Sequence, residues 1–137
     1  MAVLTPYIFS MDARTQADFY LRAFGGEIVS VLTYQEQPEV AGEPARERVL
    51  YLSLVAGGMN FLMSDTWLEP ISRGSGMELS LEFAGESEAQ EAFDKLAAGG
   101  SVKSPLKRSS KGALFGQIED KYGVIWRITN RSEAKLA

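Results

Sequence analysis

The sequence predicts an α+β fold in which two tandem β-α-β-β-β modules form curled mixed sheets around a cleft. One observation is a repeat, since residues 18–26 read DFYLRAFGG and residues 92–100 read AFDKLAAGG. Another is the match of GMNFLM at 58–63 with GVIWRI at 123–128. In each copy a helical pattern ends in Gly-Gly and leads into strands. Self-similarity of this kind predicts a duplicated structural unit.

The elements of the first module follow from periodicity and capping residues. Residues 5–10 alternate with bulky side chains and predict a strand. Asp12 suits the N-cap of a helix, and Gly25-Gly26 provide its C-terminal stop. The later expectations are a strand at 27–34, a polar loop at 35–47, and a hairpin of strands at 49–55 and 59–64.

The second module is expected after a Gly- and Pro-containing linker at 66–76. Ser87 is the predicted cap of a helix that runs to Gly99-Gly100. The other expectations are strands at 77–83, 101–106, 113–119 and 124–129, and a basic loop at 107–112. We expect one domain over 1–137, with module one at about 1–65, module two at 77–130 and a polar tail at 131–137.

Composition excludes several classes of function. The formal net charge of -4 argues against nucleic acid as a partner, because phosphate binding needs a basic face. The absence of cysteine and histidine excludes disulfides, thiolate nucleophiles, imidazole bases and His-containing zinc sites. The most apolar stretch, residues 50–63, is too short to span a bilayer, and the first residues have no signal-peptide pattern. We therefore expect a soluble cytoplasmic protein without a membrane partner.

Several motifs resemble a known family. They are TPYIF at 5–9, FY at 19–20 with FGGE at 24–27, LMSD at 62–65 and DKYGVIW at 120–126. Together they resemble the PhnB-like branch of the vicinal-oxygen-chelate superfamily, which includes glyoxalase I, fosfomycin resistance proteins, extradiol dioxygenases and bleomycin-binding proteins. The resemblance implies a glyoxalase-like fold and a homodimer. Some members carry the label demethylubiquinone methyltransferase, but no strand followed by a Gly-rich turn predicts a Rossmann-type site here.

The resemblance also implies where a metal would be held. In metal-dependent members four side chains bind the ion, and the corresponding positions here are Leu4, Leu62, Glu78 and Arg127. Neither leucine can ligate a metal, and a protonated guanidinium repels a cation. We therefore expect no metal and no other cofactor, and neither glyoxalase nor dioxygenase activity.

Strand alternation assigns the side chains that would face the cleft. Glu78 and Arg127 stand where two ligands of one ion would converge, so we expect an ion pair between them. Its role stays open between recognition of a carboxylate or phosphate and a purely structural pair. The expected ligand-binding residues are Leu52, Leu62, Glu78, Ser80, Phe115, Gln117 and Arg127.

Other candidates are weaker, and none is assigned a catalytic role. Trp67 is expected to cap the core or a dimer contact, with a lid as the alternative. The basic cluster of Lys103, Lys107, Arg108 and Lys111 favours a solvated loop over an anion site. Three functions are weighed: metal-independent binding of an amphiphilic small molecule, a lyase or isomerase that uses carboxylates such as Glu78 or Glu119, and a partner-binding protein with an occluded cleft.

Overall fold

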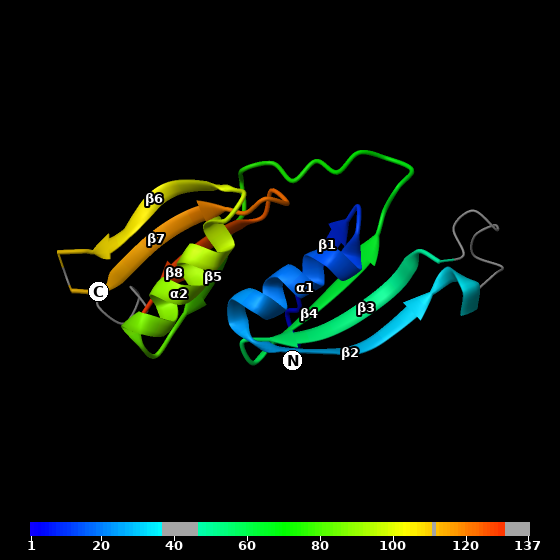
Figure 1. The fold of residues 1–137 in the computed structure, drawn as a ribbon, viewed down its shortest axis with the longest axis horizontal. Helices are drawn as coiled ribbons and strands as arrows, with labels where there is room; N and C mark the ends of the chain where they lie inside the picture. Colours follow the sequence, from blue (N-terminus) through cyan, green and yellow to red (C-terminus); the bar gives the residue numbers. More distant parts are fainter. Residues whose placement is uncertain (37–46, 111, 131–137) are drawn as a thin grey trace. The chain divides into compact units, whose positions relative to one another are not determined.

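The computed structural model describes residues 1–36, 47–110 and 112–130, and the chain divides into two compact units, Met1–Ser72 and Arg73–Ala137. Each unit contains one four-stranded mixed sheet and one α-helix (Figure 1). The predicted α+β fold with two β-α-β-β-β modules is confirmed. Parts of two predicted segments, the polar loop 35–47 and the basic loop with Lys111, lie outside the described residues, as does the whole tail 131–137.

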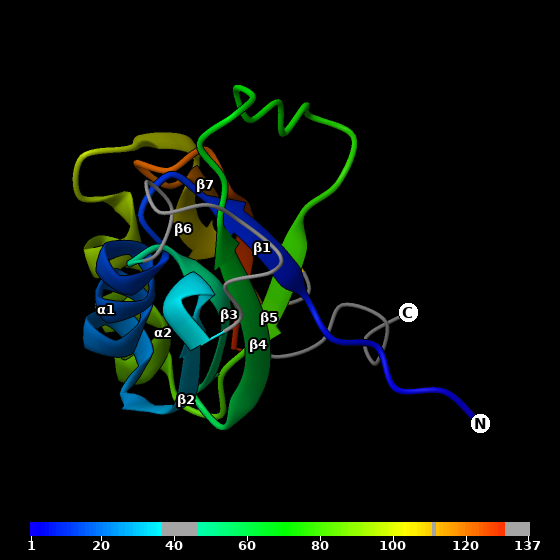
Figure 2. The same ribbon diagram turned by 90° about the vertical axis from the view of Figure 1, so that its right-hand side faces the viewer.

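The first unit is built from β1 (Tyr7–Ser10), α1 (Ala13–Phe24), β2 (Gly26–Thr33), β3 (Val49–Ala56) and β4 (Met59–Asp65), with a short 3₁₀ turn at Tyr34–Glu36. The sheet order is β1-β4-β3-β2, and only the β1–β4 pair is parallel. The helix α1 covers one face of this sheet (Figure 2). A ring contact from Tyr20 to Phe61, with centroids 6.5 Å apart, joins α1 to β4 on that face.

The second unit repeats this plan with β5 (Leu79–Glu82), α2 (Glu86–Ala97), β6 (Ser101–Arg108), β7 (Leu114–Glu119) and β8 (Ile125–Thr129). Its sheet order is β5-β8-β7-β6, again with one parallel pair, β5–β8. β5 corresponds to β1 and β8 to β4, so the topology of the two units is the same. The internal repeat in the sequence therefore reports a true structural duplication.

The caps of the two helices differ. The Asp12 carboxylate accepts a hydrogen bond from the Thr15 backbone N–H at 3.2 Å, and α1 ends at Gly25, whose φ of 78° favours glycine. The prediction that Ser87 caps α2 is wrong, because the N-cap is Gly85 and Ser87 lies in the first helical turn. Glu86 and Glu88 in that turn provide the negative charge that favours a helix N-terminus.

The predicted start of the basic loop at residue 107 is also wrong. Lys107 and Arg108 belong to β6, opposite Phe115 and Leu114, so β6 extends two residues beyond the predicted strand. Two register shifts interrupt the pairing of β6 with β7. Such bulges break the alternation of side chains on which the sequence-based boundary depended.

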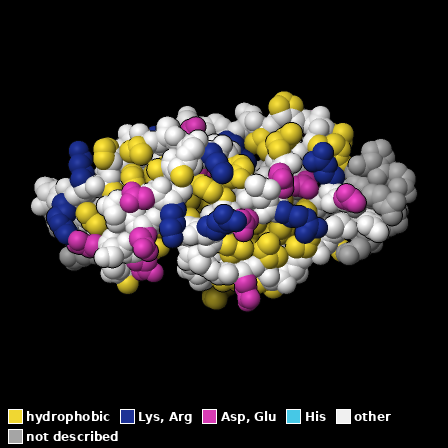
Figure 3. Space-filling view, viewed as in Figure 1, with side chains coloured by type: hydrophobic (Ala, Val, Ile, Leu, Met, Phe, Trp, Pro, Cys, Tyr) yellow, Lys and Arg dark blue, Asp and Glu magenta, His cyan; other side chains and the backbone are white. Residues whose placement is uncertain are grey.

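The surface over the helices carries mixed charge. In the view of Figure 3, Lys and Arg side chains lie among Asp and Glu side chains. None of the described helices has the length and apolar character needed to cross a membrane.

Candidate ligand-binding face of the second unit

The face of the second sheet that lies opposite α2 can be identified from Gly116 in β7. A Cβ atom at Gly116 would lie 2.5 Å from Cε2 of Phe93 in α2, so Gly116 faces the helix. Because neighbouring residues of a strand point to opposite sides, Phe115 and Gln117 lie on the other face. Arg127 of β8 stands directly opposite Gln117 and belongs to the same face.

Ser80 and Glu78 complete this group. Ser80 pairs in register with Arg127 across the parallel β5–β8 ladder. Glu78 lies just before β5, and its side chain contacts both Gln117 and Arg127. The four-stranded sheet thus brings residues 78, 80, 115, 117 and 127 to one surface, which we call the polar face.

The centre of the polar face is an ion pair. The Arg127 Nε–H donates a hydrogen bond to Oε1 of Glu78, and the Gln117 side-chain amide donates one to Oε2. The side chains of Arg127 and Glu78 are 32% and 24% exposed, so the pair is partly shielded from water without being sealed from it. The guanidinium carbon of Arg127 also lies 4.4 Å from the centroid of the Phe115 ring, in cation–π geometry.

These contacts determine the charge state of Glu78. Burial raises the pKa of this carboxyl, but the hydrogen bonds from Arg127 and Gln117 and the positive charges of Arg127 and Lys103 outweigh burial. The net effect places the pKa of Glu78 below its ordinary value of 4.5. Glu78 is therefore an anion at neutral pH and a poor proton carrier there.

The predicted ion pair between Glu78 and Arg127 is confirmed. The structure also places Ser80, Phe115 and Gln117 on the predicted face, opposite α2. Binding of a ligand by these five residues stays a prediction. Their proximity follows from the register of β5, β7 and β8 together with the alternation of each strand.

The faces were assigned incorrectly for part of the first sheet. Leu52 is fully buried and stands opposite Met63, on the face that carries Phe61 and α1. It does not face away from the helix as predicted. Leu62 does lie on the side away from α1, where it is half-buried and in register with Tyr7 and Ser53.

Two features of the structure were missed at the level of sequence. Lys103 is close enough to Glu78 for its charge to lower the pKa of that carboxyl, yet it was assigned to a basic loop cluster. Tyr7 and Phe9 lie on the face of β1 that points away from α1, with ring centroids 5.4 Å apart and exposed fractions of 45% and 54%. Alternation within residues 5–10 could have revealed the Tyr7–Phe9 pair, but the bulges of β6 hide the position of Lys103.

Asp120 has a structural role between β7 and β8. The buried carboxylate of Asp120 accepts hydrogen bonds from the backbone N–H groups of Tyr122 (2.8 Å) and Val124 (3.1 Å) and from the indole N–H of Trp126 (2.8 Å). Asp120 therefore holds the β7–β8 turn. Trp67 meets the edge of the Tyr34 ring, with centroids 5.4 Å apart.

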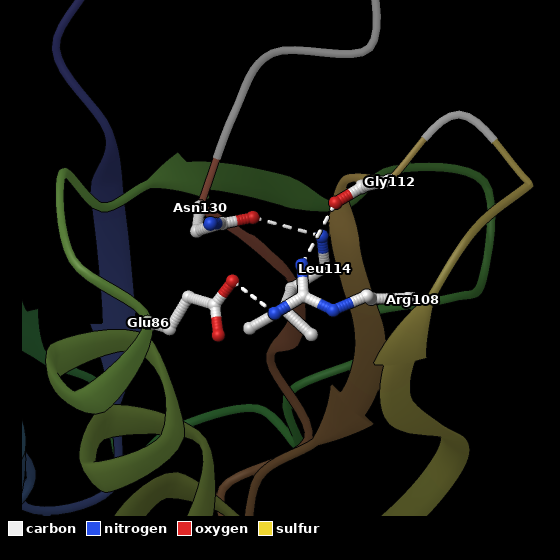
Figure 4. A network of polar contacts seen from close by, with 5 residues as sticks. All are labelled: Glu86, Arg108, Gly112, Leu114 and Asn130. Atoms are coloured by element: carbon white, nitrogen blue, oxygen red, sulfur yellow. Dashed lines mark hydrogen bonds and ion pairs between the residues drawn. The ribbon is translucent and has the colours of Figure 1, made fainter.

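Arg108 belongs to a separate polar network at the end of the β6–β7 hairpin (Figure 4). Its guanidinium donates to the Gly112 carbonyl at 2.9 Å and pairs with Glu86 at the start of α2. Next to it, the side-chain carbonyl of Asn130 accepts from the Leu114 backbone N–H at 2.8 Å. These contacts tie the hairpin to the helix and to the end of β8.

Comparison with known proteins identifies similar chains. A family model described as 3-demethylubiquinone-9 3-methyltransferase matches residues 2–129. Protein YjdN of Escherichia coli K12 is 26% identical over 136 residues, which cover 91% of this chain and 92% of that protein. The PhnB protein from Bacillus cereus is 27% identical, with a TM-score of 0.75 and coverage of 92% of this chain and 97% of its own.

Two further solved structures support the fold. Protein PA1353 from Pseudomonas aeruginosa is 27% identical, with a TM-score of 0.79 and coverage of 93% and 96% of the two chains. The fosfomycin resistance protein FosX from Listeria monocytogenes is only 9% identical, but its TM-score is 0.70 over 99% of this chain and 98% of its own. The likeness to FosX is one of fold alone.

The sequence resemblance implies a metal position at Glu78 and Arg127, and the side chains of the polar face can be compared with the donors that a divalent cation needs. Both carboxylate oxygens of Glu78 already accept hydrogen bonds, and the neighbouring Arg127 guanidinium is positively charged and repels a cation. Over residues 1–36, 47–110 and 112–130 no three Asp or Glu side chains come together in a group that could hold an ion. The donor set of this face does not fit a divalent cation.

Proposed function

The chain belongs to the 3-demethylubiquinone-9 3-methyltransferase family, in the PhnB-like branch of the vicinal-oxygen-chelate superfamily, and within this family we propose that it is a metal-independent small-molecule binding protein. The proposed ligand is amphiphilic and carries an anionic group. Its binding surface is the polar face of the second unit.

One observation carries this proposal: the half-buried Arg127 guanidinium, held between the Glu78 carboxylate and the Phe115 ring. Arginine in such a setting is oriented before a ligand arrives, so less conformational entropy is lost on binding. Its planar donor array suits an oxyanion, and the Phe115 ring offers apolar contact for the rest of the ligand.

The description of the family names a methyltransferase, but the fold favours another role. A Rossmann-type methyltransferase would place a nucleotide-like cofactor at a Gly-rich turn between a parallel strand and a helix. The described residues form two mixed sheets, and each sheet contains a single parallel pair. The second unit thus provides a binding surface of side chains on a mixed sheet.

The state of the carboxylates favours binding over proton-transfer chemistry. A general base or acid is most effective when its pKa lies near the working pH. The pKa of Glu78 is instead lowered, because its hydrogen bonds and neighbouring cations outweigh the effect of burial. Asp120, which follows Glu119 at the end of β7, is committed to hydrogen bonds within the β7–β8 turn.

The proposal is tested by nuclear magnetic resonance with benzoate, phenylacetate and octanoate as probes at millimolar concentration. We expect at least one of them to shift the signals of Arg127, Gln117 and Phe115. Arg127→Gln should weaken that binding at least tenfold, while Arg127→Lys should recover only part of it, because lysine lacks the planar fork.

A matched control is Arg22→Gln, which removes an arginine from an exposed ion pair with Asp18 on α1. This variant should bind the probes as the wild type does. The proposal is wrong if no probe shifts these signals, or if Arg127→Gln binds as tightly as the control.

A further inference from the structure

We propose that Glu78 competes internally with anionic ligands for Arg127, and that it thereby restricts the ligands of the polar face to species with one negative charge and disfavours dianions such as phosphate monoesters. This inference rests on the proposed function and specifies the ligand class of the same face.

The competition follows from the geometry of the ion pair. Oε1 of Glu78 accepts from Nε of Arg127, so a carboxylate already lies at the edge of the guanidinium where a ligand oxyanion would bind. Gln117 holds the other oxygen, Oε2, and so fixes the carboxylate in this position. An incoming anion must therefore share Arg127 with a fixed negative charge.

The rest of the polar face does not supply an excess of positive charge. Lys103 acts on Glu78 electrostatically, and Lys107 lies opposite Phe115 in the ladder. Glu119, two residues beyond Gln117 in β7, lies on the same face by alternation. Glu82 follows Ser80 on β5 in the same way, so the described acidic and basic side chains of this face balance.

Because the charges of the polar face balance, a second negative charge on the ligand does not raise its affinity. A single carboxylate gains a hydrogen bond and cation–π support, and the attraction of Arg127 is largely offset by the repulsion of Glu78. For a second negative charge on the ligand, the attraction of Arg127 is again offset by the repulsion of Glu78. A dianion also costs more to desolvate than a monoanion, so its second charge adds no affinity. Removing the charge of Glu78 would make every ligand charge favourable.

The size of this effect can be bounded with Coulomb's law. Two unit charges about 6 Å apart change affinity roughly threefold in bulk water and about a hundredfold at the effective dielectric constant of a protein surface. We therefore expect Glu78→Gln to increase affinity on the order of tenfold for each negative charge of the ligand.

The experiment compares benzoate with phenyl phosphate at about pH 8, where the phosphate monoester is a dianion. Binding is measured by isothermal titration calorimetry and by nuclear magnetic resonance. The wild type should bind phenyl phosphate no more tightly than benzoate. Glu78→Gln should bind benzoate about tenfold more tightly and phenyl phosphate more tightly still, by about a hundredfold.

Two further variants separate charge from structure. Glu91→Gln removes one negative charge from the exposed side of α2 and should leave both affinities unchanged. The double variant Glu78→Gln/Arg127→Gln should bind both probes no more tightly than the wild type, because the lost attraction of Arg127 offsets the lost repulsion of Glu78. Glu78→Gln should stay folded, because the Gln117 amide can rotate to offer its oxygen to the new side-chain NH₂ group.

Each outcome has one meaning. If Arg127→Gln abolishes benzoate binding but Glu78→Gln weakens it or leaves it unchanged, Glu78 is a positioning partner and the competition is refuted, while the proposed function stands. A preference of the wild type for phenyl phosphate refutes it as well. If benzoate binding is insensitive to Arg127→Gln, the proposed function itself fails.

Discussion

A double-mutant cycle on Glu78 and Arg127 tests whether their contact is energetically real. The cycle compares the wild type with Glu78→Gln, Arg127→Gln and the double variant. A hydrogen bond to a charged group contributes about 1.5–3 kcal/mol, whereas an exposed ion pair contributes about 0.2–1 kcal/mol. Side-chain exposures of 24% and 32% place this pair between those limits. We expect a coupling energy of about 1–2 kcal/mol.

The assay is urea denaturation followed by tryptophan fluorescence, in a Trp67→Phe background in which Trp126 reports on the second unit. Trp126 is fully buried in that unit, so its emission should change when the unit unfolds. The exposed pair of Arg22 and Asp18 on α1 of the first unit, with side chains 80% and 55% exposed, provides the reference cycle, which is followed by far-ultraviolet circular dichroism. Its coupling should stay below about 0.5 kcal/mol. A coupling energy for Glu78 and Arg127 no larger than that of the reference pair would show that their contact does not stabilise the second unit.

Three further predictions concern stability. The pKa of Glu78 is lower in the folded chain than its ordinary 4.5, so its contribution to the free energy of unfolding is present above that value and is lost as pH falls through the folded pKa. In an acid titration of stability, Glu78→Gln should therefore lose free energy of unfolding less steeply than the wild type. An unchanged slope would contradict this. Gly116→Ala would set a Cβ 2.5 Å from Cε2 of Phe93 and should lower the free energy of unfolding by about 1–3 kcal/mol. Gly76→Ala is the control, because Gly76 has open space around it, and it should have little effect. Equal melting temperatures of the two variants would contradict the close packing of Gly116 against Phe93. Asp120→Ala removes three hydrogen bonds, two of them to buried groups, and should cost about 2–4 kcal/mol in urea denaturation, so a loss below about 0.5 kcal/mol would be inconsistent with its role in the turn.

The arrangement of elements could be predicted because two strong signals agreed. The Gly-Gly pairs at 25–26 and 99–100 follow helical patterns of the same length, and alternating strands surround them in the same order. The helix cap at Asp12 was predictable from side-chain chemistry. The cap at Gly85 was not, because a glycine N-cap has no side-chain acceptor and its helix start is stabilised by Glu86 and Glu88.

The sequence predicted the polar face of the second sheet correctly, but it assigned part of the first sheet to the wrong face. On β5, β7 and β8 polar and apolar residues alternate, so the side with the apolar residues is the one expected to be buried against α2. On β3 Leu52 and Leu54 face one way and Val55 faces the other, so both faces of the strand carry apolar residues that can be buried. The contact of Tyr20 with Phe61 shows which face α1 covers. Alternation gives two faces, but tertiary packing chooses between them.

We propose that Arg127 binds an anionic organic molecule without help from a metal, and this binding can be measured with and without added cations. The most direct measurement is the affinity for benzoate of protein treated with EDTA, compared with protein supplied with stoichiometric Mn²⁺, Zn²⁺ or Ni²⁺. We expect the same dissociation constant in every case, and at least tenfold weaker binding in Arg127→Gln under all conditions. Binding that appears only after one of these cations is added, together with retention of that cation at one per chain, would contradict the claim.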